Sequence, residues 1–195
     1  MTPRLAAMAL ALSVPRVATA APVTIDVRGT DGAPLADAVV TVEIAGRHAV
    51  QRGPYVMEQK AIAFQPHVLI VPLGATVSFP NRDPFRHHVY SFSRAKKFDL
   101  KLYGHDETRS VVFDRAGVVA LGCNIHDSMT GFIVVVDTPY AARTDRAGRV
   151  TIADVPPGAA TLRVWSPVIH APDNSLSQGI AVGPAGLATS VAIRR

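Results

Sequence analysis

The chain has 195 residues, and its 20 Lys and Arg outnumber its 15 Asp and Glu to give a formal net charge of +5 at pH 7. An excess this small argues against a nucleic-acid-binding protein, and the length suits one large domain or two small ones. Because Cys123 is the only cysteine, a disulfide within the chain is excluded. In an oxidising compartment we expect its thiol to be buried, paired with another chain or bound to a metal.

The first 20 residues have the pattern of a secretory signal peptide. Arg4 precedes the apolar run 5–14, and Ala18-Thr19-Ala20 matches the small residues of a cleavage site. We therefore expect cleavage after Ala20 and a periplasmic location. Neither this run nor any later segment is long enough to span a bilayer, so we expect no transmembrane segment after cleavage.

The remaining sequence is dominated by short segments rich in Val, Ile and Thr, bounded by turn residues such as Pro72-Leu73-Gly74 and Pro156-Pro157-Gly158. We identify no helix among them. The predicted strands are 23–28, 38–44, 67–71, 75–79, 88–93, 110–113, 117–121, 131–137, 148–152, 160–165 and 189–193. Short strands at this spacing predict an all-β sandwich or barrel.

Residues 95–103 are expected to form a further strand at a sheet edge rather than a turn of helix. Phe98, Leu100 and Leu102 alternate there with charged residues, which is the period of a strand with one buried face. The lysines of this segment are then expected to face water.

One short loop gathers three residues that bind soft or borderline metals. Cys123, His126 and Met129 lie at spacings of three. Together with a second imidazole, they would make the trigonal site with a weak axial Met that holds copper for electron transfer. The second imidazole would come from His87 or His88. Taken singly, a Cys or Met is more often a buried apolar side chain, so the argument rests on the combination.

The two ends of the chain share a different pattern. Residues 27–42 resemble the first hairpin of carboxypeptidase-regulatory-like, prealbumin-type domains. Residues 143–165, with a Thr144-Asp145-x-x-Gly148 turn, a Pro157-Gly158 turn and a final amphipathic strand, look like the second half of that module. The resemblance implies a discontinuous β-sandwich of residues 21–50 and 138–195. The alternative is a single extended sandwich with decorating strands.

Residues 51–137 resemble the cupredoxins, specifically the plastocyanin and amicyanin group. The motif Asn81-x-Asp83-x-x-x-His87-x-Val89 matches that family's Asn-x-acid-x-x-x-His-Asn-Val, and Cys-x2-His-x2-Met is the short, amicyanin-like spacing of its ligand loop. Further matches are Phe64-Gln65-Pro66, the Pro72-Leu73-Gly74 turn with the strand after it, and Phe113-Asp114-x-x-Gly117. With its flanking segments, the whole chain is similar to cupredoxin-like proteins labelled methylamine-utilization proteins.

The cupredoxin resemblance implies a Greek-key β-sandwich that holds one copper ion, inserted in or joined to the second small sandwich. It assigns His87, Cys123, His126 and Met129 as ligands, and implies a single-electron carrier, not an enzyme, that meets a redox partner protein in the periplasm. His88 stands where the family has the Asn that braces the ligand loop. We therefore expect His88 and Asn81 to hold the ligand residues in place by hydrogen bonds, with His88 as the alternative ligand.

Lysines close to the copper module suggest a docking surface. Lys96, Lys97 and Lys101 fall in one segment and could meet an acidic redox partner. The competing interpretation is a solvated strand edge that lysine protects from pairing with other chains.

Other functions remain open from the residues alone. A periplasmic copper carrier or storage protein would use the same ligand atoms, and a non-redox binding module could use a metal only to stabilise its fold. A Cys-His nucleophile would need an orienting third group and an oxyanion hole, whereas Cys123 is expected at the end of a buried strand, and no motif of a Ser or Asp triad is present. Zinc is disfavoured because Met is a poor zinc ligand.

Overall fold

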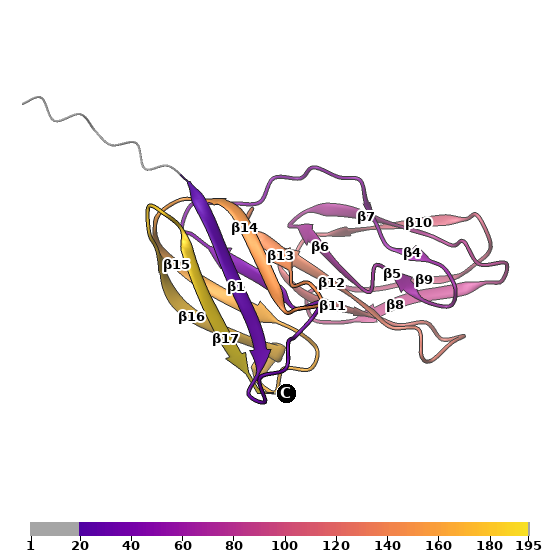
Figure 1. Ribbon diagram of the computed structural model, residues 1–195. Coiled ribbons are helices and arrows are strands. Elements are labelled where there is room, and N and C mark those ends of the chain that lie inside the picture. Colours follow the sequence, from indigo (N-terminus) through magenta and orange to yellow (C-terminus); the bar gives the residue numbers. More distant parts are fainter. Residues whose placement is uncertain (1–19, 195) are drawn as a thin grey trace, which may run out of the picture.

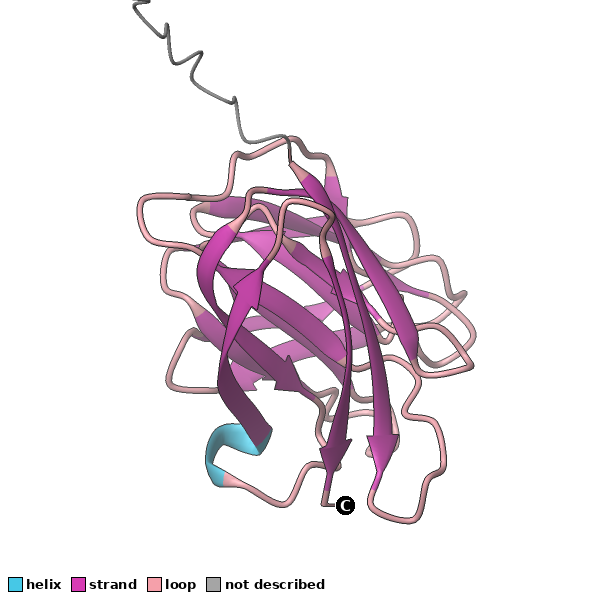
Figure 2. Ribbon diagram, turned by 60° about the vertical axis from the view of Figure 1, so that its left-hand side comes forward, coloured by secondary structure: helices cyan, strands magenta, loops and turns pink. Residues whose placement is uncertain are grey.

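The computed structural model describes residues 20–194, whose regular secondary structure consists of β-strands and one 3₁₀ turn at Pro172–Asn174 (Figures 1 and 2). The predicted all-β class is therefore confirmed. The predicted signal peptide, residues 1–20, lies outside the described residues except for Ala20. Within the described part, no helix has the length and apolar character needed to cross a membrane.

The strands form two groups, which we call the flanking half and the central half. The flanking half contains β1 (Ala21–Gly29), β2 (Val39–Glu43), β13 (Ala141–Arg143), β14 (Arg149–Val155), β15 (Gly158–Trp165), β16 (Ser175–Val182) and β17 (Leu187–Ile193). The central half contains β3 (Tyr55–Val56), β4 (Glu58–Gln59), β5 (Phe64–Gln65), β6 (Val68–Pro72), β7 (Ala75–Pro80), β8 (His87–Phe92), β9 (Lys97–Tyr103), β10 (Thr108–Phe113), β11 (Gly117–Leu121) and β12 (Gly131–Val136).

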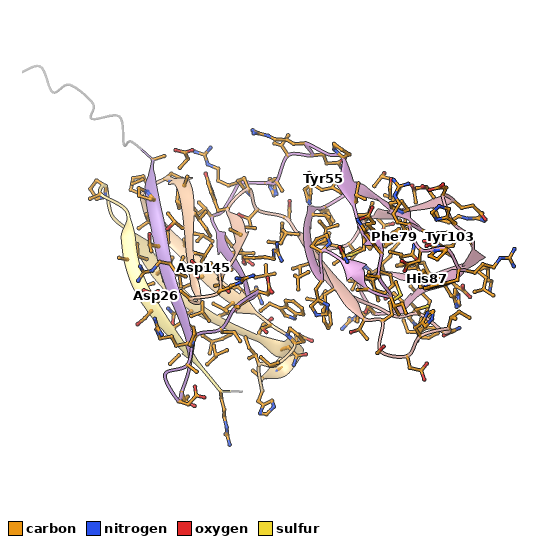
Figure 3. The ribbon with its side chains drawn as sticks, turned by 45° about the vertical axis from the view of Figure 1, so that its right-hand side comes forward. Asp26, Tyr55, Phe79, His87, Tyr103 and Asp145 are labelled. Atoms are coloured by element: carbon orange, nitrogen blue, oxygen red, sulfur yellow. The ribbon has the colours of Figure 1, made fainter. Side chains whose placement is uncertain are left out.

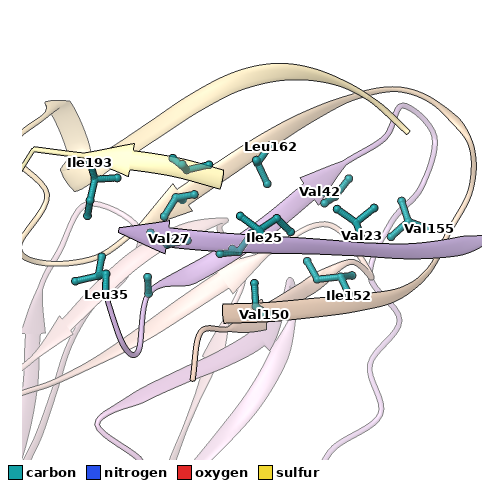
Figure 4. Close-up of a cluster of buried hydrophobic side chains, with 14 of the residues drawn as sticks. Val23, Ile25, Val27, Leu35, Val42, Val150, Ile152, Val155, Leu162 and Ile193 are labelled. Atoms are coloured by element: carbon teal, nitrogen blue, oxygen red, sulfur yellow. The ribbon is translucent and has the colours of Figure 1, made fainter. Parts of the chain in front are cut away.

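The flanking half is built from two sheets with strand orders β14-β1-β17 and β13-β2-β15-β16. Val23, Ile25 and Val27 alternate along β1 with more exposed residues, so one side of this strand carries the apolar side chains. These three are fully buried in a cluster that also receives Val42 and Leu162 from the other sheet (Figure 4). Early and late parts of the sequence thus share one hydrophobic core.

The central half has its own core. Strands β10-β7-β3 and β11-β12-β6 form two sheets, and the β8-β9 pair joins the second of these through a bridge between Tyr90 and Gly122. Phe64, Phe79 and Phe113 are buried between them, in the cluster that also contains Cys123. The only cysteine therefore lies in the core of the central half, as expected for a thiol that is protected from oxidation.

A third, smaller cluster joins the two halves. Val39 and Trp165 from the flanking half are buried with Val134 and Val136 from the central half. The Trp165 ring also lies edge-on to Phe132, with 5.2 Å between ring centroids. Alternate residues of β12 therefore serve two cores, because Ile133 and Val135 belong to the core of the central half.

Most predicted strands are present, but the buried face of one strand was predicted wrongly and another strand was missed. Residues 97–103 form β9 at a sheet edge, but Leu102 is 46% exposed whereas Tyr103 is buried. The cause is a bulge, since Leu100 and Lys101 together oppose one residue of β8, and Lys101 has φ = 58°. An extra residue in a strand reverses the alternation of its side chains beyond that point. Strand β16 was not predicted; only one of its eight residues, Val182, is buried, so its sequence lacks the alternation of a strand with one buried face.

Candidate metal centre

Three of the predicted ligands meet at one end of the central half. Ligand atoms of His87, Cys123 and His126 all lie within 4.8 Å of one another, although His87 is 36 residues away from Cys123 in sequence. His87 is the first residue of β8, and the other two lie in the loop between β11 and β12. Figure 3 shows His87 in the central half with Phe79 and Tyr103, whereas Asp26 and Asp145 belong to the flanking half.

His87 is fully buried, and one nitrogen of its ring is hydrogen-bonded to a carboxylate. Its Nε2 lies 2.7 Å from Oδ2 of Asp83, and its Nδ1 lies 3.8 Å from Sγ of Cys123. A carboxylate acceptor places the imidazole proton on Nε2, which leaves the lone pair of Nδ1 on the side of the thiol. This is the arrangement in which a carboxylate orients a histidine that binds a metal.

The carboxylate of Asp83 is itself fixed by the backbone. The amide N–H groups of Ala61 and Ile62 donate to its two oxygens at 2.7 and 3.0 Å. Both donors have positive φ angles, 54° and 56°, so this turn is shaped to present its amides. Burial alone would raise the pKa of Asp83, but the hydrogen bonds from Ile62, His87 and Ala61 outweigh it and hold that pKa below its ordinary value.

His126 provides the observation that best fits a metal. Its Nδ1 is buried and has no hydrogen-bond partner. Buried polar atoms in proteins are nearly always paired, so an orphaned imidazole nitrogen beside a thiol and a second imidazole needs an explanation. A soft or borderline metal ion bound by these three donors would supply one.

Met129 lies in the same buried core cluster as Cys123 and is 1% exposed. Its backbone N–H donates to the carbonyl oxygen of His126 at 2.8 Å, which closes the loop after the histidine. The side chains of Cys123 and Met129 therefore both lie in the core of the central half. Met129 as fourth ligand stays a prediction.

Phe85 was not predicted to take part in the site, but its ring contacts both imidazoles. The ring centroids are 5.2 Å from His87 and 5.4 Å from His126, and the two histidine rings are 5.2 Å apart. Because Phe85 is 41% exposed, its ring forms part of the outer cover of the site. Only the tertiary structure brings this ring to the loop after Cys123.

His88 and Asn81 have roles that differ from each other. Nε2 of His88 bonds to Oδ1 of Asp99 on β9, and the His88 ring contacts Tyr90, on the side of β8 opposite His87. Asn81 donates from Nδ2 to the carbonyl of Phe85 at 2.8 Å and accepts from the backbone N–H of Asp83 at 2.9 Å. Asn81 therefore shapes the loop that carries Asp83, whereas His88 lies outside the three-residue cluster.

The predicted docking lysines are largely engaged with carboxylates. Lys96 pairs with Asp114 at 2.9 Å, and Lys101 pairs with Asp99 at 2.6 Å. Lysine and histidine hydrogen bonds, that of Lys101 first and that of His88 next, hold the pKa of Asp99 below its ordinary value. Lys97 is exposed. These contacts resemble a solvated strand edge, and the docking surface stays a prediction.

Comparison with known proteins adds a likeness over about half of the chain. No family model and no curated protein matches the sequence. A copper-containing nitrite reductase from Thermus scotoductus SA-01 is 29% identical with a TM-score of 0.42, covering 48% of this chain and 24% of that one. A reduced Cu(I) form of an amicyanin variant is 23% identical with a TM-score of 0.41, covering 50% and 98%.

A purple cupredoxin from Nitrosopumilus maritimus is 22% identical with a TM-score of 0.37, covering 42% of this chain and 96% of that one. The chain thus spans about a quarter of the nitrite reductase but nearly all of the amicyanin and the purple cupredoxin. Cupredoxins, which the motifs in residues 51–137 resemble, are therefore among the solved structures to which this chain is similar. The prealbumin-type resemblance of the flanking segments stays a prediction.

Proposed function

We propose that this protein is a periplasmic type 1 copper protein that transfers single electrons through one mononuclear site, with His87, Cys123, His126 and Met129 as ligands. One observation carries the proposal: three donors lie within 4.8 Å of one another, and the buried Nδ1 of His126 has no other partner. Thiolate and imidazole donors with a nearby thioether suit copper better than zinc or a hard cation.

Copper bound here would accept and release one electron. The residues of the chain hold the site still during that change. Cys123 lies two residues after the end of β11, and His87 begins β8 with its ring fixed by Asp83. Ligands held on a strand and in a short loop between two strands have little freedom to rearrange between two oxidation states, which favours fast electron transfer.

Burial favours an electron carrier over a copper carrier. His87 is fully buried, and Cys123 and Met129 are at most 3% exposed. An ion held by such side chains would exchange slowly with other proteins, whereas an electron needs only a short path to the surface. His126 is the most exposed of the four ligand residues and is the proposed exit for electrons to a redox partner.

We further propose that residues 51–137 form the copper-binding domain and that residues 21–50 with 138–195 form a second sandwich. The separate hydrophobic clusters of the two halves support this division. The periplasmic location rests on the signal-peptide pattern in residues 1–20.

The test is the visible and electron paramagnetic resonance spectrum after loading with one equivalent of Cu(II). We expect an intense thiolate-to-copper band and a narrow copper hyperfine splitting. Cys123→Ser should abolish the band, because the thiolate is its source, and Met129→Leu should keep the band and raise the reduction potential.

The buried Met57 offers a matched control. Met57 is fully buried in the same core cluster as Met129, so Met57→Leu should leave the potential unchanged. A full-intensity band in Cys123→Ser would contradict the ligand assignment. A pale, ordinary Cu(II) spectrum from the unaltered protein would favour a copper carrier or a non-redox binding module.

A further inference from the structure

Strand β16 leaves an open edge on the flanking half. In the sheet β13-β2-β15-β16 it pairs only with β15, and no strand of the described residues is joined to its other edge. With 8 residues it is the longest strand at an edge of the described sheets. Figure 1 shows β16 on the side of the flanking half that faces away from the central half. The backbone N–H and C=O groups along this edge are therefore free to pair with another strand.

The edge of β16 lacks the features that normally prevent such pairing. Charged side chains, prolines and bulges protect edge strands from other chains. The edge strands β9, β10, β13 and β14 each carry at least one Lys or Arg. In contrast, β16 contains no charged residue and no proline, and its register with β15 is unbroken. The adjacent edge strand β17 is uncharged as well.

Gly179 lies inside β16, although a glycine weakens a strand because it has more conformational freedom to lose and no side chain to pack. Its backbone does not have the positive φ angle that would require glycine. A Cβ atom at this position would meet nothing within 4 Å. Neither the conformation nor the packing of the described residues therefore explains this glycine. A glycine inside a regular strand also marks places where another backbone approaches closely, and the open edge offers such a place.

The side chains on the core side of β16 form a symmetric pattern. Leu176 and Ile180 pack against the core of the flanking half and are only partly buried. Gln178 lies between them, opposite the buried Leu162 of β15, and is exposed. Two positions before Gln178 and two positions after it, the core side therefore carries a half-buried aliphatic residue.

We propose that two copies of this chain pair antiparallel through β16, about a two-fold axis at Gln178. This register sets Leu176 of each copy opposite Ile180 of the other, so that each covers the exposed part of its neighbour. On the outer face, the small residues Ser177 and Gly179 lie opposite each other. Gln178 faces Gln178 of the second copy, and because an amide side chain both donates and accepts, the two can hydrogen-bond. The four-stranded sheets of the two copies then form one continuous sheet.

The symmetry of β16 is the reason to choose a second copy over an unrelated segment. An axis at residue 177 or 179 would set Gln178 opposite Leu176 or Ile180, whereas an axis at Gln178 matches polar with polar and apolar with apolar. An axis between two residues would set core-side residues opposite outward ones, which the alternation of a strand disfavours. All four proposed metal ligands lie in the central half, so the pairing does not depend on copper.

Sedimentation equilibrium of the purified protein tests for this dimer. One strand pair makes a small interface, so we expect reversible association with a dissociation constant on the order of 10 µM. Between about 1 and 300 µM protein, which brackets this constant, the average mass should rise from that of one chain towards that of two, with and without copper. A single chain at every concentration would overturn the proposal and leave the edge to an extended segment of another protein.

Two substitutions at the proposed axis test the register. Gln178→Lys and Gln178→Glu should each weaken self-association about fivefold, because two like charges would then lie directly opposite each other. An equimolar mixture of the two variants should recover the dimer, because opposite charges then face each other across the axis. Since Gln178 is exposed, neither variant should lower the melting temperature of the single chain.

Ser190→Lys is the matched control, because Ser190 is an exposed residue of β17, the adjacent uncharged edge strand. This variant should associate like the unaltered protein. Loss of the dimer in Ser190→Lys, with an unchanged dimer in Gln178→Lys, would place the interface on β17 and overturn the proposal. Equal association of the Lys variant, the Glu variant and their mixture would also overturn it, because residue 178 would then not face its own copy.

Discussion

At the scale of single residues, the metal centre depends on a chain of contacts that begins outside it. The amides of Ala61 and Ile62 fix Asp83, Asp83 fixes the ring of His87, and that ring presents Nδ1 to Cys123. Each contact removes a rotation that the next group would otherwise have. The histidine is therefore oriented before any metal binds, which lowers the conformational cost of binding.

Asp83→Asn should weaken copper binding while keeping the thiolate band. The amide has nearly the same shape as the carboxylate but no charge, so its bond to the His87 ring is weaker. Groups that orient a metal-binding histidine typically contribute a factor of about 10–100 to metal affinity. Competition with a chelator of known affinity would measure the loss.

A matched variant for Asp83→Asn is Asp106→Asn. Asp106 is an exposed carboxylate that pairs with Arg82 and His105 and does not contact the site. Its variant should bind copper like the unaltered protein. Equal affinities for the two variants would show that Asp83 does not position His87.

The sequence predicts the donor residues better than it predicts their supports. Cys123, His126 and Met129 are recognisable because one short loop contains all three. The contact between Asp83 and His87 cannot be recognised in the sequence. Asp83 is held in place by the backbone amides of Ala61 and Ile62, which are remote from it in sequence. The family motif favours His87 over His88 as the ligand, and the structure places the two on opposite sides of β8.

At the scale of strands, the bulge in β9 and the bridge between β8 and β11 are features that periodicity does not predict. Apolar alternation located β9 correctly, but the extra residue opposite Val89 turned Leu102 outward. The predicted strand at residues 117–121 coincides with β11. Its start was marked in the sequence by Gly117 and its end by the ligand loop that contains Cys123. Boundaries are thus predictable where turn residues mark them.

Gly122 lies between β11 and Cys123, at a position where any side chain would collide with the ring of Tyr90. A Cβ atom at Gly122 would lie 2.7 Å from Cζ of Tyr90 and 2.8 Å from its hydroxyl. The backbones of these two residues also exchange hydrogen bonds of 3.1 and 3.0 Å. The absence of a side chain therefore lets β8, which carries His87, approach β11.

Gly122→Ala should destabilise the protein by about 1–3 kcal/mol, the usual cost of overpacking. Urea unfolding monitored by circular dichroism would measure it. Tyr90→Leu in the same chain should recover part of the loss, because the shorter side chain leaves room for the methyl group. A double-mutant cycle with no coupling between the two positions would contradict this account.

At the scale of the whole molecule, residues of four strands, β2, β6, β12 and β15, tie the two cores together. Val134 and Val136 of β12 belong to the junction while their neighbours belong to the core of the central half. Val39 of β2 and Trp165 of β15 belong to the junction while their neighbours belong to the flanking core. The sequence motifs suggested two modules, but the junction could not be predicted, because it pairs faces from distant parts of the chain.

We expect this junction to make the two halves unfold together. Copper at 100 times its dissociation constant should stabilise the folded state by about 2.7 kcal/mol, which corresponds to about 5–10 °C in melting temperature for a chain of this size. All four proposed ligands lie in the central half, whereas Trp165 belongs to the flanking half. If the halves are coupled, the unfolding transition reported by Trp165 fluorescence should nevertheless rise with copper by the same amount as the calorimetric transition. The contrary result would be a Trp165 transition whose midpoint does not change with copper, while the thiolate band persists to higher temperature. It would show that the halves unfold independently and that the junction contributes little to cooperativity.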